Sequence, residues 1–405
     1  MKATLPILMM AMTATGVFAA TPVIDNVTMT QAEGSRKVII SYKLTGEDAI
    51  VTAEVFHNGE TIGLDKVVNM TGAVNAMVTA GEDVKEIQWR PNKTWPNKEY
   101  NDGSISVKLT AWTKACPPPY MAVNLEAQNI VRYYVSSNAV PGGIQDRRYK
   151  TTWMLFKKIP AAGVMCRLGS SPKELDATSD TCMMTFTQDF YAGVFEVTRK
   201  QYSMVATDPS KSTAFEDAEI CPVTNVSYDD FRGKVSDNPS VNWPTTDRTT
   251  ISESSVLHAF RSRTGLLLDL PTEAQWEFAA RAGVETLYQN GARTWDAAVN
   301  KVMLEPVAWY SDTSDGKPHP VGKLDPNAFG LYDMIGNAME WCLDWEGAWP
   351  MEAVDYAGKT SGNSRMMRGT CFSWNDATAR FAWRKTNTSD NGSSENGVRL
   401  FLTLD

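Results

Sequence analysis

The sequence predicts two folded units, an all-β sandwich followed by an α+β domain with much irregular structure. Short segments of alternating apolar and polar residues, separated by turns, occupy residues 22–140, which is typical of an immunoglobulin- or fibronectin-like β-sandwich. The run Pro141-Gly142-Gly143 then interrupts this pattern. Residues 150–405 contain several short helices with recognisable N-caps, and the length of 405 residues suits two such domains.

Residues 1–19 have the features of a secretory signal peptide. Lys2 supplies a positive start, residues 5–12 form an apolar stretch, and Val17-Phe18-Ala19 resembles a small-residue cleavage site. A short membrane anchor is the alternative, but the apolar run falls short of the roughly 20 residues that a span requires. We therefore expect an exported protein, periplasmic or extracellular, without a membrane span.

The first unit contains several predicted strands. Lys37–Tyr42, Ile50–Phe56, Ser104–Trp112 and Ile130–Tyr134 are rich in β-branched and aromatic residues, as strands are. The sequence His57-Asn58-Gly59-Glu60 predicts a tight hairpin turn after the second of them. No catalytic constellation occurs in this unit, and domains of this type usually space or dock other domains.

The second unit begins with a predicted strand over Met154–Pro160 and continues with small helices. Thr198 and Thr272 each stand three residues before a glutamine, which is the pattern of a capping box, and Ser227 can cap a helix of its own. The helix that starts after Thr272 is expected to extend through residue 282. Its buried stripe, at three- and four-residue spacing, is expected to be Trp276, Ala279, Ala280 and Gly283.

Composition argues against several functions. The formal net charge is -8 and no basic run occurs, so a nucleic-acid partner is not expected. The three histidines are scattered and no cysteine pair has Cys-x-x-Cys spacing, which argues against a zinc or non-haem iron site. In an exported protein we expect disulfides, with Cys166–Cys182 and Cys342–Cys371 as candidate pairs, although the sequence leaves the connectivity open.

The stretch Phe329–Trp345 places Asp333 and Glu340 on either side of a Gly336-Asn337 pair. Glycine and asparagine both tolerate positive φ, so the pair favours a turn that directs the carbonyls of Gly336 and Ala338 inward. Several oxygen ligands without nitrogen or sulfur suit a hard cation, and Ca²⁺ best. The spacing is not that of an EF-hand. The alternative is an aromatic-rich turn whose carboxylates merely face solvent.

The same stretch resembles a known family. Residues 330–341, GLYDMIGNAMEW, are similar to the G-L-Y-D-M-x-G-N-x-x-E-W signature of the formylglycine-generating-enzyme (sulfatase-modifying factor) family. Other segments resemble further landmarks of that family in the same order: Phe195–Thr198, Pro222–Ser227, Leu270–Arg281, Arg368-Gly369 and Gly397–Arg399. The resemblance covers residues 155–405.

This resemblance implies both a fold and a metal site. The family domain is a variant of the C-type-lectin-like fold, so residues 150–405 are expected to adopt that α+β architecture. The family binds a structural calcium through this loop. Carried over residue by residue, the ligands are the side chains of Asp333 and Glu340 and the backbone carbonyls of Gly336 and Ala338.

The resemblance also bears on catalysis. Enzymes of the family convert a sulfatase cysteine to formylglycine with O₂ and a Cu(I) held by two cysteine thiolates, which are soft ligands that select Cu(I). These cysteines follow the motif that Arg368–Phe372 resembles. Counted along this chain, they fall on Trp374 and Ala379, so both ligands are missing. Cys371, at the serine position of the motif, is a single thiol, and copper binding is not expected.

Two functional hypotheses follow. The first is an exported, calcium-stabilised, lectin-like module that recognises a protein or glycan without oxidase activity, with Trp374, Cys371 and Arg384 as candidates for its binding groove. Its other tryptophans are expected mainly in the core. The second is an enzyme, either a sulfatase-maturing oxidase or one with an unrecognised site. Stoichiometric copper, or turnover of a Cys-x-Pro-x-Arg peptide, would favour the second.

Overall fold

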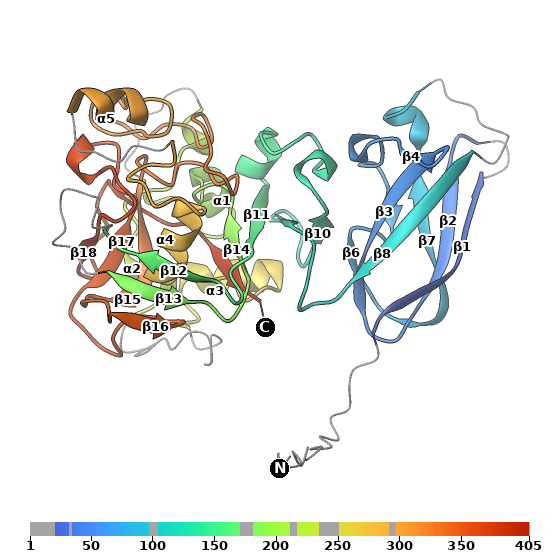
Figure 1. Ribbon diagram of the computed structural model, residues 1–405, viewed down its shortest axis with the longest axis horizontal. Helices are drawn as coiled ribbons and strands as arrows, with labels where there is room; N and C mark the ends of the chain where they lie inside the picture. Colours follow the sequence, from blue (N-terminus) through green and yellow to red (C-terminus); the bar gives the residue numbers. More distant parts are fainter. Residues whose placement is uncertain are drawn as a thin grey trace, which may run out of the picture.

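The computed structural model describes residues 21–31, 35–96, 104–170, 181–210, 217–234, 251–290 and 297–404. The predicted signal peptide, residues 1–19, lies outside these ranges. Figure 1 shows two units side by side, one of strands with the short 3₁₀ helices η1 (Leu64–Lys66) and η2 (Pro91–Lys93), and one of mixed strands and helices. Within the described ranges, no helix has the length and apolar character needed to cross a membrane.

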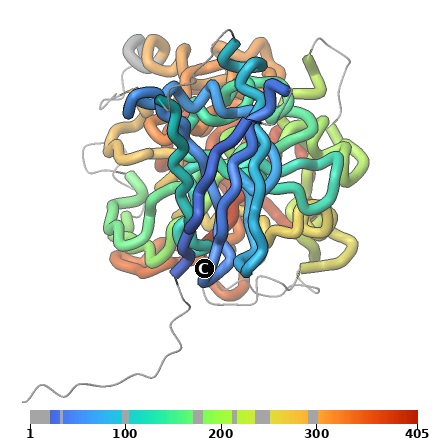
Figure 2. The backbone as a smooth tube through the Cα atoms, turned by 90° about the vertical axis from the view of Figure 1, so that its right-hand side faces the viewer, coloured from blue at the N-terminus to red at the C-terminus, as the bar shows by residue number. Residues whose placement is uncertain are grey.

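The first unit consists of antiparallel strands in two sheets. One sheet has the order β1 (Val23–Gln31), β2 (Val38–Thr45), β7 (Gly81–Trp89) and β5 (Thr71–Gly72). The other has the order β4 (Glu60–Thr61), β3 (Ala49–His57) and β6 (Ala76–Val78), with β8 (Ile105–Trp112) also paired to β3. In the end-on view these strands run beside one another in front of the second unit (Figure 2).

Apolar side chains from both sheets of the first unit form one core. Ile40 and Tyr42 on β2, Val51 on β3 and Trp89 on β7 are all buried in this cluster. The predicted strands at 37–42, 50–56 and 104–112 are confirmed, as is the hairpin, where Asn58 and Gly59 have positive φ. The immunoglobulin- or fibronectin-like type of this unit stays a prediction.

The second unit contains a five-stranded antiparallel sheet. Its order is β10 (Val131–Tyr134), β9 (Tyr120–Asn124), β11 (Trp153–Ile159), β14 (Phe190–Gly193) and β20 (Phe401–Thr403). The assignment of Ile130–Tyr134 to the first unit is therefore wrong. Because β10 pairs with β9 and β9 pairs with β11, strand pairing changes between residues 112 and 120, well before Pro141.

Two smaller sheets and several helices complete the second unit (Figure 1). The first sheet has the order β12 (Met165–Leu168), β13 (Cys182–Thr185) and β16 (Glu352–Val354). The second has the order β18 (Lys385–Asn387), β17 (Arg365–Arg368), β15 (Met339–Trp345) and β19 (Asn396–Gly397). The α-helices are α1 (Arg199–Ser203), α2 (Tyr228–Arg232), α3 (Val256–Thr264), α4 (Glu273–Arg281) and α5 (Ala297–Leu304).

The helix starts follow the predicted caps. Thr198 and Thr272 both form complete capping boxes, at α1 and α4, and Ser227 accepts a hydrogen bond at the start of α2. Helix α4 differs from the expectation because all nine of its residues are buried, not only one stripe. Gly283, expected in that stripe, is exposed, since the helix ends at Arg281 and residue 282 turns to positive φ.

The second unit has two large apolar cores. Cys342 and Ala379 belong to one, whereas Cys371 belongs to the other. All six cysteines are free in the structure, so the expected disulfides are not formed. Cys342 and Cys371 do not pair because their side chains lie in different cores. In the hairpin of β12 and β13, Cys166 lies opposite Met184 and not opposite Cys182.

Candidate functional site

The loop that carries the predicted calcium ligands is a tight turn held by buried polar bonds. Gly336 and Asn337 have φ values of 86° and 63°, which confirms the expected turn. A Cβ on Gly336 would lie 2.2 Å from the carbonyl oxygen of Trp309, so only glycine fits there. The side-chain Nδ2 of Asn337 donates to Glu196 Oε2 at 2.7 Å, and the side-chain Oδ1 of Asn337 accepts from the backbone N–H of His319 at 2.9 Å.

Glu340 lies in the interior and its carboxylate already has partners. Arg399 donates from Nη2 to Oε1 at 2.7 Å and from Nε to both oxygens at 3.0 and 3.1 Å. The indole N–H of Trp276 donates to Oε2 at 2.6 Å. Glu340 and Arg399 are 1% and 0% exposed, so the solvent-facing alternative is wrong for this residue.

Asp333 is also buried, but its carboxylate is only half satisfied. Oδ2 accepts from the N–H of Gly322 at 2.7 Å, whereas Oδ1 has no hydrogen-bond partner within the described part of the chain. Burial raises the pKa of Asp333 to about 6. Burial also raises the pKa of the neighbouring Glu196, and the charges of Asp333 and Glu340 raise it further.

These observations fit a calcium ion only in part. The unpartnered Oδ1 of Asp333 and the local excess of carboxylates both suit a cation. Glu340 does not offer a free oxygen, because Arg399 and Trp276 use both. Among the residues that the structure describes, no group of three or more His, Cys, Asp or Glu side chains is arranged to hold a metal ion. Calcium binding by Asp333, Gly336, Ala338 and Glu340 stays a prediction.

The two positions that the resemblance predicts to correspond to the copper cysteines lie in different surroundings. Ala379 is fully buried in one apolar core. Trp374 is half-buried, and its ring meets that of Trp383 edge to face with centroids 5.2 Å apart. Cys371 is buried in the second core, 3.3 Å from the hydroxyl of Ser373. Burial raises the pKa of the Cys371 thiol to about 12, so this thiol stays protonated.

Arg384, the third groove candidate, is held by helix α4. It forms a bidentate ion pair with Glu273, from Nε at 2.6 Å and from Nη2 at 2.7 Å. Glu273 also accepts from Arg368 at 3.1 Å and from the indole of Trp349 at 2.8 Å. Arg368 in turn donates to Glu277, the next acidic residue on the helix. This buried network fixes the position of Arg384.

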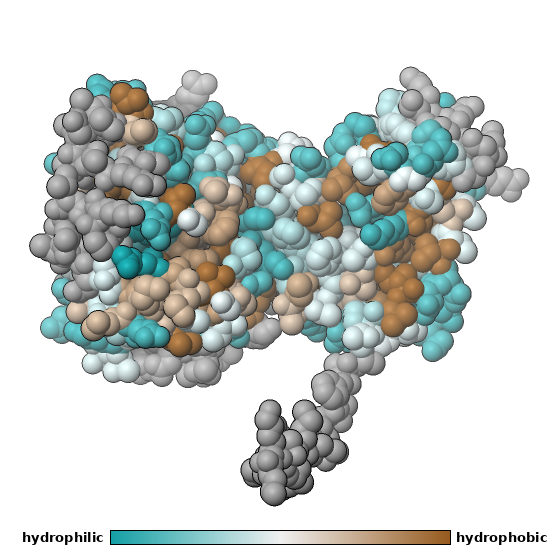
Figure 3. Space-filling view, viewed as in Figure 1, coloured by the Kyte–Doolittle hydropathy of each residue, from teal (hydrophilic) through white to brown (hydrophobic). Residues whose placement is uncertain are grey.

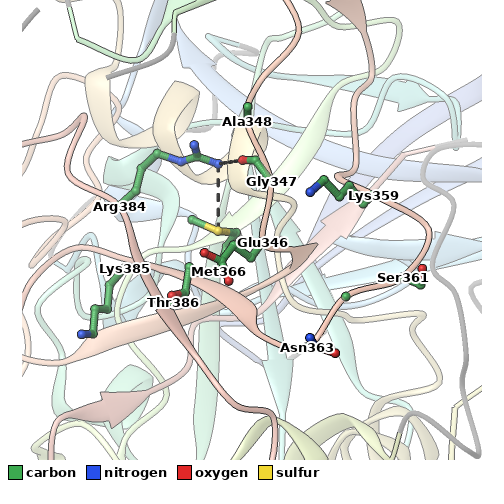
Figure 4. Close-up of a pocket in the computed structure, with 11 residues that line it drawn as sticks. Glu346, Gly347, Ala348, Lys359, Ser361, Asn363, Met366, Arg384, Lys385 and Thr386 are labelled. Atoms are coloured by element: carbon green, nitrogen blue, oxygen red, sulfur yellow. Dashed lines mark hydrogen bonds between the residues drawn. The ribbon is translucent and has the colours of Figure 1, made fainter. Parts of the chain in front are cut away.

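Arg384 lines an open polar pocket of about 720 Å³ beside β17 and β18 (Figure 4). Lys359 and Lys385 lie on opposite sides of Glu346 in this view. The Lys385 ammonium is 5.1 Å from the centre of the Trp374 ring, so it connects the tryptophan pair to the pocket. Of the three groove candidates, Arg384 therefore lines the pocket, Trp374 contacts it through Lys385, and Cys371 lies in an apolar core.

Sequence reasoning missed the buried charges that organise both regions. Glu196, Glu273 and Arg399 lie within the motifs that resemble the family, but the motifs themselves indicate no role for these three side chains. One signal was available: Glu277 stands four residues before Arg281 on a helix otherwise rich in apolar residues, which indicates an ion pair along the helix. The structure has this pair at 2.7 Å. Nothing in the sequence indicates that Glu277 also accepts hydrogen bonds from other elements, from Arg368 and from the N–H of Gly169.

Comparison with known proteins agrees with these motifs. Residues 167–404 match the family described as the sulfatase-modifying factor enzyme 1-like domain. The formylglycine-generating enzyme of Thermomonospora curvata is 32% identical over 144 residues, which cover 32% of this chain and 48% of that enzyme. The enzyme of Bos taurus is 30% identical over 149 residues, which cover 32% of this chain and 37% of the enzyme.

Among solved structures, Treponema denticola variable protein 1 superposes with a TM-score of 0.46 and 27% identity, covering 62% of this chain and 95% of that protein. The match with each of the two enzymes spans less than half of the enzyme's length. Because the family pattern covers more than half of the 405 residues, the chain belongs to the sulfatase-modifying factor, or formylglycine-generating enzyme, family.

Proposed function

We propose that this chain is an exported binding protein of the family, which recognises a protein or glycan and does not catalyse copper-dependent oxidation. One observation carries the proposal: Trp374 and Ala379 stand where the family resemblance puts the copper cysteines. Neither side chain offers a thiolate, and Cu(I) requires soft ligands of that kind. Ala379 is buried, and Trp374 packs against Trp383.

The remaining thiols in this region support the same conclusion. Cys371 and Cys342 are both buried, and they belong to different apolar cores. Burial raises the pKa of both thiols, that of Cys342 well above its usual range. A protonated thiol in a core is a poor ligand for a metal, because the thiolate is the form that binds.

The pocket beside Arg384 is our candidate for the recognition surface. Ser361, Asn363 and Thr386 offer hydrogen-bond donors and acceptors, and the two lysines and Glu346 add charge. The adjacent Trp374–Trp383 pair can contribute aromatic surface to a sugar ring or a peptide side chain. Few, well-placed polar groups beside aromatic surface are the usual composition of a ligand site.

The finer structural assignments belong to this proposal. We infer a C-type-lectin-like fold for the second unit, from β9 onward, and an immunoglobulin- or fibronectin-like sandwich for the first unit, strands β1 to β8. The mixed sheets and short helices of the second unit support the first assignment, and the two antiparallel sheets over one core support the second. The unpartnered Oδ1 of Asp333 supports a structural calcium.

A copper oxidase is the second candidate function, because the relatives at 32% and 30% identity are named formylglycine-generating enzymes. On this alternative, the chain would oxidise a cysteine in a sulfatase peptide at a site that uses Cys371 or Cys342. Both buried thiols would then have to become accessible and lose their protons.

The deciding experiment is metal analysis of the purified mature protein by mass spectrometry, with a parallel Cu(I) titration. We expect one calcium and no copper above background, and no turnover of a Cys-x-Pro-x-Arg peptide. Binding is then screened on glycan and peptide arrays, with Trp374→Ala as the test variant and Trp112→Ala, on β8, as the control. Tight stoichiometric Cu(I) would overturn the proposal in favour of the oxidase.

A further inference from the structure

A second cavity, of about 270 Å³, lies where the two units meet. One wall is the segment 68–75 of the first unit, and the other comes from β10, the 3₁₀ helix η4 (Arg147–Lys150) and Trp153. The N–H of Tyr133 donates to the carbonyl of Asn75 at 2.8 Å and joins the two walls. The surface narrows between the units in the space-filling view (Figure 3). Neither unit forms this cleft alone.

Two arginines line the cleft, and only one of them has an acidic partner. Arg148 pairs with Asp146 at 2.9 Å. Arg132 is half-buried and donates to the carbonyl of Val131 at 3.0 Å, but it forms no ion pair with any residue that the structure describes. Two guanidinium groups against one carboxylate leave one positive charge in excess. A half-buried guanidinium without a counter-charge favours binding of an anion.

A tyrosine near both guanidinium groups adds a donor. Tyr134 is buried and lines the same cleft. Burial raises the pKa of its phenol to about 12, and the charges of Arg132 and Arg148 oppose that rise, because both groups are near it. The phenol therefore keeps its proton at neutral pH and can donate a hydrogen bond. Met70, Val74 and Trp153 supply apolar surface around these donors.

We propose that this cleft is a binding site for a small anionic ligand, whose carboxylate or phosphate oxygens are held by Arg132 and Arg148 with Tyr134 as an additional donor. Arginine suits such a role because its planar group can donate two parallel hydrogen bonds to an oxyanion. The apolar wall accommodates a short carbon skeleton. Since both units contribute to the cleft, a bound anion stabilises their mutual arrangement.

The test is calorimetric titration of the mature protein with inorganic phosphate and, separately, with succinate, at constant ionic strength set by chloride. We expect saturable one-to-one binding of at least one of them, with a rise in melting temperature that follows mass action. Preference for phosphate or for succinate identifies the source of the oxyanion. Arg132→Gln is expected to weaken binding about tenfold or more, as loss of a charged hydrogen bond does.

Two further variants make the result specific. Arg132→Lys keeps the positive charge but loses the planar group that donates two parallel hydrogen bonds. The affinity of this variant for the anion is therefore expected to lie between those of the wild type and Arg132→Gln. Arg167→Gln removes an exposed arginine of β12 that does not line the cleft, and it is expected to bind as the wild type does. Absence of saturable binding to both anions, or equal binding by Arg132→Gln and Arg167→Gln, would overturn the proposal. Melting temperatures in chloride establish that each variant is folded.

Discussion

Arg399 and Glu340 form a buried ion pair in which the guanidinium contacts both carboxylate oxygens, at 2.7 to 3.1 Å. The same guanidinium donates from Nη1 to the carbonyl of Gly193 at 3.0 Å and from Nη2 to that of Tyr332 at 2.9 Å. It therefore joins β15, the end of β14 and the loop before Asp333. This side chain is thus one of the groups that hold the predicted calcium loop to the rest of the domain, together with Glu196 and Trp276.

Glu340→Gln is expected to destabilise the protein by about 3 kcal/mol, the lower end of the range for breaking a buried ion pair. The variant leaves the charge of Arg399 buried, but the carboxylates of Glu196 and Asp333 still act on that charge and offset part of the loss. Urea unfolding at neutral pH measures the difference.

The matched control is Glu82→Gln, which breaks the exposed pair with Lys43 at 3.3 Å. Because the Glu82 side chain is 92% exposed, solvent screens this pair and little change is expected. A Glu340→Gln variant as stable as Glu82→Gln would show that the buried pair contributes nothing.

Removal of calcium tests the metal prediction. If calcium binds the native state only, a chelator is expected to lower the melting temperature by about 5 °C or more, and added calcium to restore it. Asp333→Ala is expected to melt at the same temperature with and without chelator, because the variant lacks the unpartnered carboxylate oxygen. Differential scanning calorimetry measures both. An unchanged melting temperature of the wild type in chelator would remove Asp333 and Glu340 from the metal assignment.

Asp344 is expected to make stability fall as pH rises from about 4 to about 8. Burial raises its pKa to about 8, and the charge of Glu273 contributes to the rise. Between its ordinary value and 8, the folded state holds a proton that the unfolded state releases, so each rise in pH favours unfolding. Asp344→Asn cannot ionise, and its amide oxygen can still accept from the Glu273 N–H, which donates to Asp344 at 2.6 Å. The variant is expected to show a flatter dependence and higher stability than the wild type at pH 8.

Urea unfolding at pH 5, 6.5 and 8 measures this effect. Asp312→Asn, which alters an exposed carboxylate, is the control and should keep the slope of the wild type. Parallel curves for the wild type and Asp344→Asn would contradict the assigned pKa.

Substitution of Arg384 is expected to lower stability, whereas substitution of its neighbour Lys385 is expected to weaken ligand binding. Arg384→Ala removes two charged hydrogen bonds from the buried Glu273 but leaves those from Arg368 and Trp349, so a loss of about 2 kcal/mol is expected. Lys385→Ala changes a half-buried side chain over Trp374 and is expected to leave stability nearly unchanged while weakening binding of any array ligand. Unfolding curves and array affinities together separate the two. Equal loss of stability in both variants would show that the network does not hold Arg384.

Features that depend on a few consecutive residues were predictable from the sequence. The capping boxes at Thr198 and Thr272 form because the threonine and the glutamine three residues later bond to each other's backbone. The hairpin at Asn58-Gly59 forms because both residues accept positive φ. The turn at Gly336-Asn337 has the same origin.

Features that depend on contacts between residues far apart in the sequence were not predictable from it. Ile130–Tyr134 has the composition of a strand, but the residues around it do not indicate that it pairs with β9 and not with a strand of the first unit. The cysteines are equally uninformative, because two thiols pair only if the fold brings them together. Cys342 and Cys371 lie in separate cores, which spacing along the chain cannot show.

The sequence by itself determined the family and carried its motifs, and from the resemblance it predicts that Trp374 and Ala379 stand in place of the copper cysteines. Only the tertiary structure decided which charges meet. Arg399 reaches Glu340 across 59 positions of the chain, and Arg384 reaches Glu273 across 111. Burial of a charged side chain is costly without a partner, and that partner is supplied by whichever element packs against it. Capping and turn formation need no such element, and for that reason the sequence alone predicts them.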